Sequence, residues 1–225
     1  MRISPLEGHR IWASSYDSGD NPLLALERRS MANLLRFVKR TTVIDVACGS
    51  GTWLLRLQEA GVTVFGVDFC EEMLAKATEV PCLRGSVALG DAESLPFRTD
   101  AADLVLCSMA LGYLRDLCKV FRELARVALP GATIAVSDLH PAATSIGWTR
   151  SFRAATVLYE IDHFPHSLQA IDNAAKASGL RNAARQFAYL GQPEFPIFQS
   201  HGKADSFAEA SRTPALYLHT WEKPC

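Results

Sequence analysis

Three aspartates, Asp45, Asp68 and Asp91, lie near the ends of three successive strand-like runs of the chain. In an open parallel sheet, ligands bind beyond the carboxyl ends of the strands, so the three carboxylates would share one edge. There Asp68 can accept hydrogen bonds from both hydroxyls of a ribose, and Asp91 can accept one from the exocyclic amine of an adenine. Each aspartate alone could be a loop acid or a helix cap, but the three together favour a nucleoside-binding site.

The first of these runs leads into a glycine loop, Gly49-Ser50-Gly51. Glycine permits positive φ and removes the Cβ that would keep a ligand away from the backbone. The free N–H groups at the start of the following helix point to the same place. A dinucleotide-binding loop needs a third glycine where this chain has Leu54, and Asp45 would oppose a phosphate but attract an ammonium. The loop therefore favours a ligand with a cationic amino-acid portion, and it argues against the alternative of a nicotinamide-dependent reductase.

Alternating strands and helices position this loop. Strand-like runs occur at 41–47, 62–68, 87–91, 103–109 and 132–139, and helix-like runs at 23–38, 52–61, 70–80 and 116–129. Strands that alternate with helices in this way predict an α/β fold with a parallel sheet. After Pro141 the pattern is weaker. A helix is expected over 166–180, capped by Ser167 and closed by Gly179, and the last strand, 214–221, is expected to enter the sheet antiparallel to its neighbours.

The composition of the chain limits its class. Its 225 residues, 48% hydrophobic and 21% charged, suit one soluble globular domain. A net charge of −1 and the lack of a basic tract argue against a nucleic-acid partner. Six cysteines without a C-x-x-C pair favour reduced thiols. The N-terminal sequence lacks the apolar core of a signal peptide, and no run approaches the length of a membrane span. A cytoplasmic protein without membrane attachment, monomeric or homodimeric, is expected.

Residues 40–141 resemble the class I S-adenosylmethionine-dependent methyltransferases. The matching segments are VIDVACGSG (43–51), VFGVDFCEEML (64–74), GDAESLPFRTDAADLVLCSMAL (90–111), LARVALPGA (124–132) and TIAVSDLHP (133–141). The D-A-x-x-L-P-F pattern at 91–97 is similar to the small-molecule branch related to the quinone-biosynthesis (type 11) methyltransferases. The resemblance implies a Rossmann-like, seven-stranded, mostly parallel sheet with an antiparallel last strand and helices on both faces. Within one domain, 1–225, we expect an N-terminal helical cap (1–40), a cofactor-binding core (41–141) and a substrate-side cover with the last strands (142–225).

S-adenosylmethionine is the cofactor that this resemblance implies. Its methionine end would lie at the glycine loop, its ribose at Asp68 and its adenine beside Asp91. The wider family often has glutamate where this chain has Asp68, although the quinone-type branch commonly tolerates aspartate. Tyr16, in the segment W12-A-S-S-Y-D17, would cap the sulfonium or pack as an ordinary aromatic residue. The implied cofactor-binding residues are Tyr16, Asp45, Ala47, Cys48, Gly49, Gly51, Asp68, Phe69, Met73, Asp91, Ala92 and Ser108.

The implied reaction displaces a methyl group from a sulfonium, for which the protein must align the reactants and exclude water. An oxygen or acidic-carbon acceptor benefits from a base. His140 follows the fifth strand on the expected edge and is the first candidate, with a capping or buried histidine as the alternative. His163 and His166 lie in the region expected to cover the site and rank behind it. No His, Asp or Glu cluster has metal-ligand spacing, so no metal is expected.

A small-molecule acceptor is favoured by exclusion. Methyltransferases acting on adenine or cytosine amines usually carry N-P-P-Y or a relative after the fourth strand, where this chain has Ser108-Met109-Ala110-Leu111. Arg150 and Arg153 could bind a carboxylate or phosphate, or form a solvated loop edge. Aromatic residues between 187 and 207 suit an apolar acceptor, a satellite core or a subunit contact. Oxygen is the favoured acceptor atom, and the alternatives are transfer to carbon or nitrogen, or a cofactor-binding subunit without activity.

Overall fold

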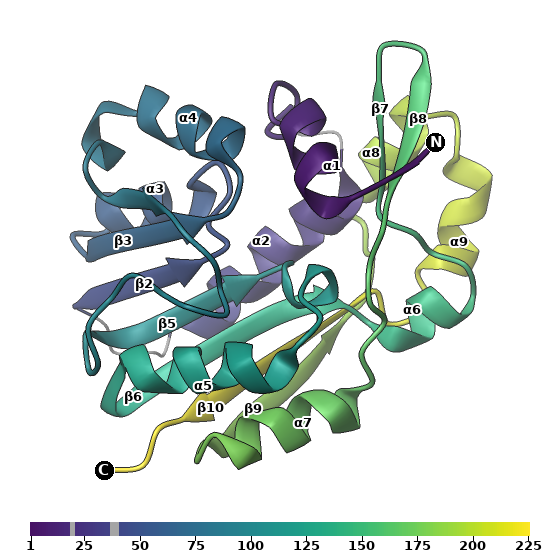
Figure 1. The fold of residues 1–225 in the computed structure, drawn as a ribbon. Helices are drawn as coiled ribbons and strands as arrows, with labels where there is room; N and C mark the ends of the chain where they lie inside the picture. The colour runs from purple at the N-terminus through teal and green to yellow at the C-terminus, as the bar shows by residue number, and fades with distance from the viewer. Residues whose placement is uncertain (19–20, 37–40) are drawn as a thin grey trace.

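A seven-stranded sheet forms the centre of the computed structural model, which describes residues 1–18, 21–36 and 41–225 (Figure 1). Its strands, in spatial order, are β4 (Val87–Leu89), β3 (Thr63–Asp68), β2 (Thr42–Val46), β5 (Ala102–Ser108), β6 (Ala128–Leu139), β10 (Leu216–Glu222) and β9 (Arg181–Ala188). β2 pairs in parallel with β3 and β5, whereas β10 runs antiparallel to both β6 and β9. The predicted mostly parallel sheet with an antiparallel last strand is confirmed.

Helices cover both faces of this sheet (Figure 1). Alternate residues of β2 face opposite sides: Val43 packs into one hydrophobic cluster, and Ile44 and Val46 pack into another. Because both faces are covered, the strand is a nearly continuous apolar run in the sequence. The helices are α5 (Leu117–Val127) and α7 (Leu168–Ala177) on the Ile44 side, and α2 (Pro22–Leu35) and α3 (Thr52–Glu59) on the Val43 side.

The predicted elements of residues 41–139 are present, with their ends shifted by a few residues. The helix predicted over 116–129 ends at Val127, because β6 begins at Ala128 and includes Pro130. The helix predicted over 70–80 is α4 (Glu71–Glu79). Beyond this region, Ser167 caps α7 as expected, its hydroxyl accepting a hydrogen bond from the Ala170 N–H. The helix predicted over 23–38 is described as α2, and its predicted end at 37–38 lies outside the described residues.

Four strands have no counterpart among the predicted elements. β9 lies at the edge of the sheet and exposes most of its side chains, so its sequence lacks apolar alternation. β7 (Ser151–Ala154) and β8 (Val157–Ile161) form a hairpin in the segment without clear periodicity. β1 (Arg2–Ile3) pairs in parallel with β8 and completes a second, three-stranded sheet.

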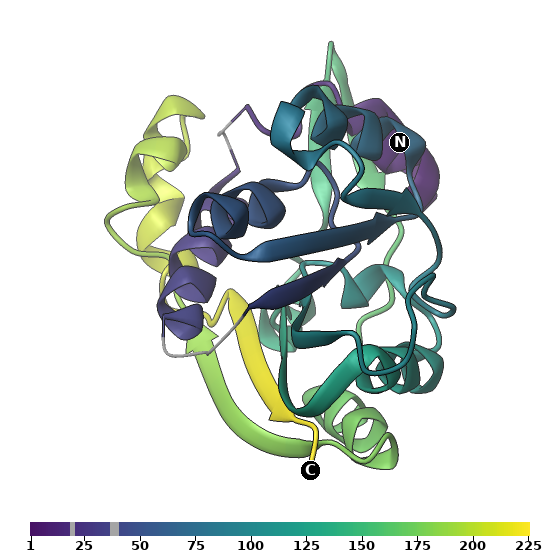
Figure 2. The same cartoon turned by 90° about the vertical axis from the view of Figure 1, so that its left-hand side faces the viewer.

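The N-terminal helix and the β7–β8 hairpin lie side by side (Figures 1 and 2). α1 (Pro5–Trp12) begins after Ser4, whose hydroxyl accepts a hydrogen bond from the Glu7 N–H. A Cβ on Gly8 would lie 2.8 Å from Ile161 Cγ1, so this glycine lets the helix approach the hairpin closely. The same side of the molecule carries three short helices, α6 (Pro141–Ser145), α8 (Phe195–Ser200) and α9 (Phe207–Ala210).

In the ranges that the structure describes, no helix combines the length and the apolar character needed to cross a membrane.

Candidate active site

A cavity of about 510 Å³ lies at the carboxyl ends of β2, β3 and β5. α1 contributes part of its wall through Pro5, Leu6 and His9. The cavity therefore combines the strand ends of the core with a segment from the start of the chain. Of the residues predicted to bind the cofactor, those that line it are Tyr16, Ala47, Gly49, Asp68, Phe69, Met73, Asp91, Ala92 and Ser108.

The glycine loop bends sharply after β2, with positive φ angles of 59° at Ala47 and 55° at Gly49. A Cβ on Gly49 would lie 3.0 Å from the Cε of Met73, so a side chain at this position would be crowded as well as strained. Asp68 holds the loop, because its Oδ2 accepts the Gly49 N–H at 2.8 Å and its Oδ1 accepts the Cys70 N–H at 2.9 Å. Burial raises the pKa of Asp68, and these two backbone donors oppose that rise.

Leu54 stands where a dinucleotide loop has its third glycine, and the neighbouring strand makes room for it. Leu54 is fully buried. A Cβ on Gly66 of β3 would lie 2.6 Å from Leu54 Cδ1 and 2.7 Å from Cys48 Sγ. Gly51 starts α3 and faces away from the cavity, because a Cβ there would lie 2.9 Å from Leu83 Cδ1. Of the predicted loop residues, Gly51 thus shapes the turn without lining the cavity.

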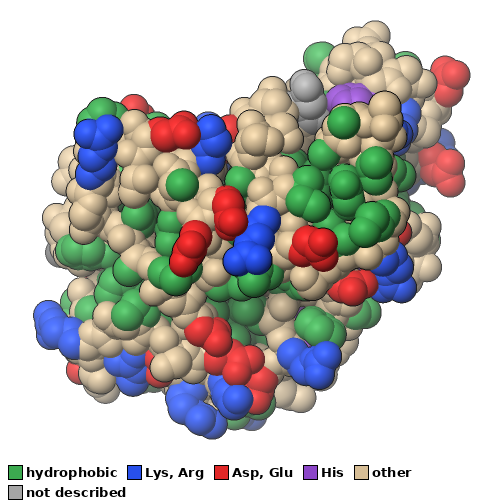
Figure 3. Space-filling model, turned by 45° about the horizontal axis from the view of Figure 1, so that its top comes forward, with side chains coloured by type: hydrophobic (Ala, Val, Ile, Leu, Met, Phe, Trp, Pro, Cys, Tyr) green, Lys and Arg blue, Asp and Glu red, His purple; other side chains and the backbone are tan. Residues whose placement is uncertain are grey.

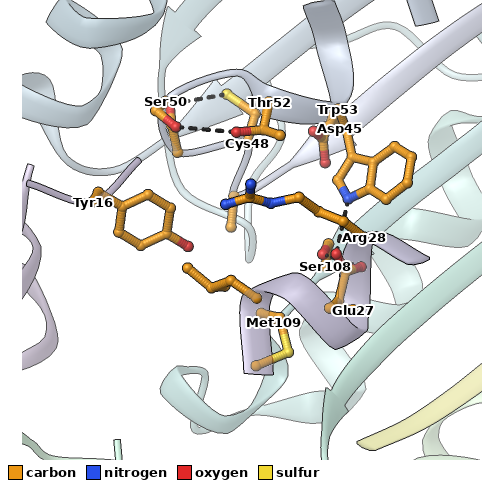
Figure 4. Close-up of a pocket in the computed structure, with 13 residues that line it drawn as sticks. Tyr16, Glu27, Arg28, Asp45, Cys48, Ser50, Thr52, Trp53, Ser108 and Met109 are labelled. Carbon is orange, nitrogen blue, oxygen red and sulfur yellow. Dashed lines mark hydrogen bonds between the residues drawn. The ribbon is translucent and has the colours of Figure 1, made fainter. Parts of the chain in front are cut away.

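A narrower pocket of about 50 Å³ adjoins the cavity and shares Tyr16 and Gly49 with it (Figure 4). The predicted residues Asp45 and Cys48 line this pocket. Arg28 of α2 extends across it, and its guanidinium lies between Tyr16 and the glycine loop (Figure 4). A cation from outside the predicted set is therefore placed next to the loop.

Glu27 is buried and lines this pocket. Its carboxylate accepts hydrogen bonds from the hydroxyls of Ser108 (2.7 Å) and Ser137 (2.9 Å) and from Trp53 Nε1 (3.2 Å). Burial raises the pKa of Glu27. Burial, followed by repulsion from Glu27 and Asp68, raises the pKa of Asp45 further, and Asp45 Oδ1 has no hydrogen-bond partner among the described residues.

One guanidinium and two buried carboxyl groups thus meet in the narrow pocket. Buried charges and unpartnered polar atoms are costly unless an oppositely charged group or a hydrogen-bond partner meets them. A free amino acid, with one carboxylate and one ammonium, supplies both. Arg28 and Glu27 are absent from the predicted set because they lie on α2, far from the motifs. Glu27 could have been noticed in the sequence, because it is a charged residue among the apolar residues Leu24, Leu26 and Met31 that α2 buries.

The other end of the large cavity is less polar. Asp91 lies there with its Oδ1 accepting the Glu93 N–H at 2.9 Å, and Ala92 is buried beside it. Phe69 and Leu89 line the same end and are 41% and 53% exposed, respectively. An apolar ring system can therefore pack here while Asp91 offers a hydrogen-bond acceptor.

None of the three histidines predicted as bases lines the cavity or the narrow pocket. His140 caps α6: its Nδ1 accepts the Ala142 N–H at 3.0 Å, and its ring packs against Phe187. This is the capping alternative raised by the sequence. His163 and His166 line a separate small pocket, where His166 Nε2 lies 2.7 Å from the Leu114 carbonyl oxygen.

His9 of α1 lines the cavity instead. Its Nδ1 lies 2.7 Å from the Pro5 carbonyl oxygen, which can only accept, so Nδ1 carries the hydrogen and Nε2 is left as an acceptor. Its ring meets the edge of Tyr113 at a centroid distance of 4.9 Å. Burial lowers the pKa of His9, which keeps the imidazole neutral near neutral pH. Sequence reasoning missed His9 because a short N-terminal helix carries no recognisable motif.

Comparisons with known proteins agree with this geometry. Residues 44–136 match the family model described as a methyltransferase domain. A demethylmenaquinone methyltransferase from Listeria monocytogenes serotype 4a (strain HCC23) is 34% identical over 134 residues, which cover 56% of this chain and 56% of that protein. The biotin biosynthesis bifunctional protein BioHC from Cellvibrio japonicus (strain Ueda107) is 26% identical over 178 residues, 77% of this chain and 33% of that protein. The chain thus spans between one third and about half of the length of these relatives.

Solved structures share the fold. A chain from the complex between the Haloferax volcanii Trm112 methyltransferase activator and a methyltransferase aligns with a TM-score of 0.73 at 22% identity, over 96% of this chain and 98% of that chain. An S-adenosylmethionine-dependent methyltransferase from Mesorhizobium loti aligns with a TM-score of 0.66 at 22% identity, over 90% of this chain and 100% of that chain. In its domain match, its relatives and its fold, the chain resembles the class I S-adenosylmethionine-dependent methyltransferases, those of quinone biosynthesis among them.

Proposed function

We propose that the protein transfers the methyl group of S-adenosylmethionine to a small-molecule acceptor, and that the acceptor atom is oxygen. The observation that carries the proposal is the meeting of three features at one sheet edge: a nucleoside-sized cavity, a pocket with one guanidinium and two carboxyl groups, and the free Nε2 of His9. When bound, the cofactor supplies a methyl carbon activated by a sulfonium. The residues of this chain bind the reactants, orient them and exclude water.

The narrow pocket suits the methionine end of the cofactor. Arg28 would hold the carboxylate through charge-assisted hydrogen bonds. Asp45, supported by Glu27, would hold the ammonium, and the unpartnered Oδ1 of Asp45 supports this assignment. Gly49 leaves the backbone open to the ligand, and Tyr16 lies in the wall shared by both compartments, where it can pack beside the sulfonium.

The large cavity suits the adenosine end. Each oxygen of Asp68 accepts one backbone N–H and retains a lone pair, so the carboxylate can still accept the two ribose hydroxyls. Asp91 would accept the adenine amine. Phe69 and Met73 would flank the ring, with Ala92 beneath it.

His9 is the base that we assign. The Pro5 carbonyl fixes the tautomer, so an acceptor hydroxyl can pass its proton to Nε2, and the nearby Asp68 stabilises the resulting imidazolium. Burial raises the pKa values of Tyr16 and Tyr113, so both phenols stay protonated near neutral pH and neither is suited to this role. The same base would serve an acidic carbon, and mass spectrometry of the product distinguishes the two acceptor atoms.

We also place the protein in the cytoplasm, as a monomer or homodimer that acts on small molecules rather than nucleic acid. A net charge of −1 supports the choice of substrate, since nucleic-acid binding depends on basic surfaces. The described cysteines are all unpaired, which supports a reducing compartment.

Titration calorimetry with S-adenosylmethionine tests the proposal. We expect binding in the micromolar range. Asp68→Ala should weaken it by about 10–100-fold, because the ribose loses its acceptor and the glycine loop loses its anchor. Asp205→Ala removes an exposed acid that lines neither compartment and should bind like the wild type. Absence of binding by the wild type at millimolar cofactor would contradict the proposal.

A further inference from the structure

A second large cavity, of about 610 Å³, lies next to the cofactor cavity. The two share His9, Tyr16, Met109 and Tyr113, so they meet at the proposed base. The second cavity is formed by α1, described residues between α1 and α2, the start of α2, the β7–β8 hairpin with the residues before it, and the residues in and after α8. Figure 3 views the molecule with the α1 and hairpin side brought forward, and hydrophobic side chains gather in the upper right of this face, below a histidine.

Stacked aromatic rings form one wall of this second cavity. The rings of Trp12 and Phe152 are stacked and nearly parallel, with 4.9 Å between ring centroids and 4° between ring planes. Tyr16 meets Trp12 edge-on at 4.8 Å. Phe198 and Leu158 line the same space. Such a wall favours a flat or apolar molecule, because aromatic faces pack well against rings and exclude water.

The charged residues of the cavity are cationic. Arg153 and Lys203 line it, and within the ranges described neither side chain has a carboxylate within 4 Å. Arg150 also lines it, but its charge is already paired with Asp138 and its guanidinium lies over the ring of Tyr113. Among the described residues that line the cavity, none is acidic. The unpaired positive charge of the wall therefore comes from Arg153 and Lys203.

We propose that this cavity binds the methyl acceptor and that the acceptor is a small organic anion with an aromatic or apolar body. The body lies against Trp12 and Phe152, the carboxylate or phosphate faces Arg153 and Lys203, and the hydroxyl to be methylated faces His9. This assignment deepens the proposed function and rests on it, because it gives the chemical class of the acceptor.

The sharing of residues supports this arrangement. A reacting hydroxyl must reach both the base and the methyl carbon, and in the described structure His9 and Tyr16 belong to both cavities. The exposed cations lie in the cover, on β7 and after α8, rather than among the four shared residues. An anionic group held by these cations leaves the neutral end of the molecule free to approach His9.

Calorimetry with three probes tests the proposal: 4-hydroxybenzoate, phenyl phosphate and the uncharged 4-hydroxybenzamide. Each is titrated into the protein with S-adenosylhomocysteine present. We expect at least one anion to bind about tenfold more tightly than the amide, and the two anions distinguish carboxylate from phosphate. The double variant Arg153→Ala/Lys203→Ala should remove that preference while leaving amide binding unchanged.

The matched control is Arg84→Ala/Lys176→Ala, which removes two exposed cations that line neither cavity. This variant should keep the anion preference. Equal binding of anions and amide by the wild type, or equal loss in both double variants, would overturn the proposal. Titration of the same samples with S-adenosylmethionine separates the two proposals. Cofactor binding without anion preference overturns the acceptor class alone, whereas absent cofactor binding overturns the proposed function and the acceptor role together.

Discussion

The two cavities differ in the charge of their walls. The proposed cofactor compartments carry Asp45, Asp68, Asp91 and the buried Glu27, against one guanidinium, that of Arg28, among their described lining residues. Within the described ranges, the neighbouring cavity carries two cations without a carboxylate partner, Arg153 and Lys203, and no acid among its lining residues. A sulfonium donor with an ammonium group suits the first, and an anionic nucleophile suits the second. Cavities of opposite charge that adjoin each other can therefore hold two oppositely charged reactants side by side. Each cavity also disfavours binding of the reactant that belongs in the other.

His9 lies where the two cavities meet, and its replacement should have the largest effect. For His9→Gln we expect the kcat of methyl transfer to 4-hydroxybenzoate to fall by about 100-fold or more, because proton removal loses its base. Affinity for S-adenosylmethionine should stay close to that of the wild type. His140→Gln, which alters a helix cap away from both cavities, is the control and should keep its kcat.

The pH dependence of the wild type gives an independent check on His9. The neutral imidazole is the active form, and burial lowers the pKa of His9 from the ordinary value of 6.5. Activity should therefore persist below pH 6.5 and decline only as the pH falls through the lowered pKa. A decline that begins above 6.5, or one that His9→Gln retains unchanged, would assign the base elsewhere.

A smaller effect, the release of protons on cofactor binding, tests the roles of Asp45 and Glu27 in the narrow pocket. Burial raises the pKa values of Asp45 and Glu27, so their carboxyl groups lose their protons at a higher pH than ordinary carboxyl groups do. A bound ammonium stabilises the carboxylate form and lowers these pKa values, so cofactor binding should release protons. The binding enthalpy should then vary with the ionisation enthalpy of the buffer, and Asp45→Asn should reduce that variation. An enthalpy independent of the buffer would contradict the account of this pocket.

The smallest effect concerns the loop itself. Gly66→Ala places a Cβ against Leu54 and Cys48, and we expect the free energy of unfolding to fall by about 1–3 kcal/mol. Leu54→Ala relieves that contact, so the double variant should lose less stability than the sum of the single variants. Chemical denaturation measures both. Additive losses would show that Gly66 does not accommodate Leu54.

More of the residues named from the sequence line the acidic cavity and pocket than line the cation-lined cavity. Asp45, Gly49 and Asp68 belong to short segments whose residues remain neighbours in the fold, so local pattern was sufficient. Asp91 lies with them because neighbouring parallel strands end at the same edge of the sheet. His9, the base that we propose, was not among the predicted residues, because it reaches the cavity through the packing of α1 on the hairpin, which no local pattern specifies.

The hairpin and β9 escaped prediction for a related reason. β9 is an edge strand with mostly exposed side chains, and β7 and β8 bury few residues, so hydrophobic alternation is weak in all three. Arg153 was predicted as a residue that could bind an anion, together with Arg150. The sequence did not show that the charge of Arg150 is paired with Asp138, which lies 12 residues earlier in the chain. Lys203 enters the cavity from a segment with no expected element.

A crystal structure with S-adenosylhomocysteine and 4-hydroxybenzoate tests the contrast between the two cavities most directly. We expect the methionine end between Arg28 and Asp45, the adenine beside Asp91, and the benzoate carboxylate facing Arg153 and Lys203. Density for the cofactor product in the cation-lined cavity, or for the benzoate carboxylate among the aspartates, would contradict the account.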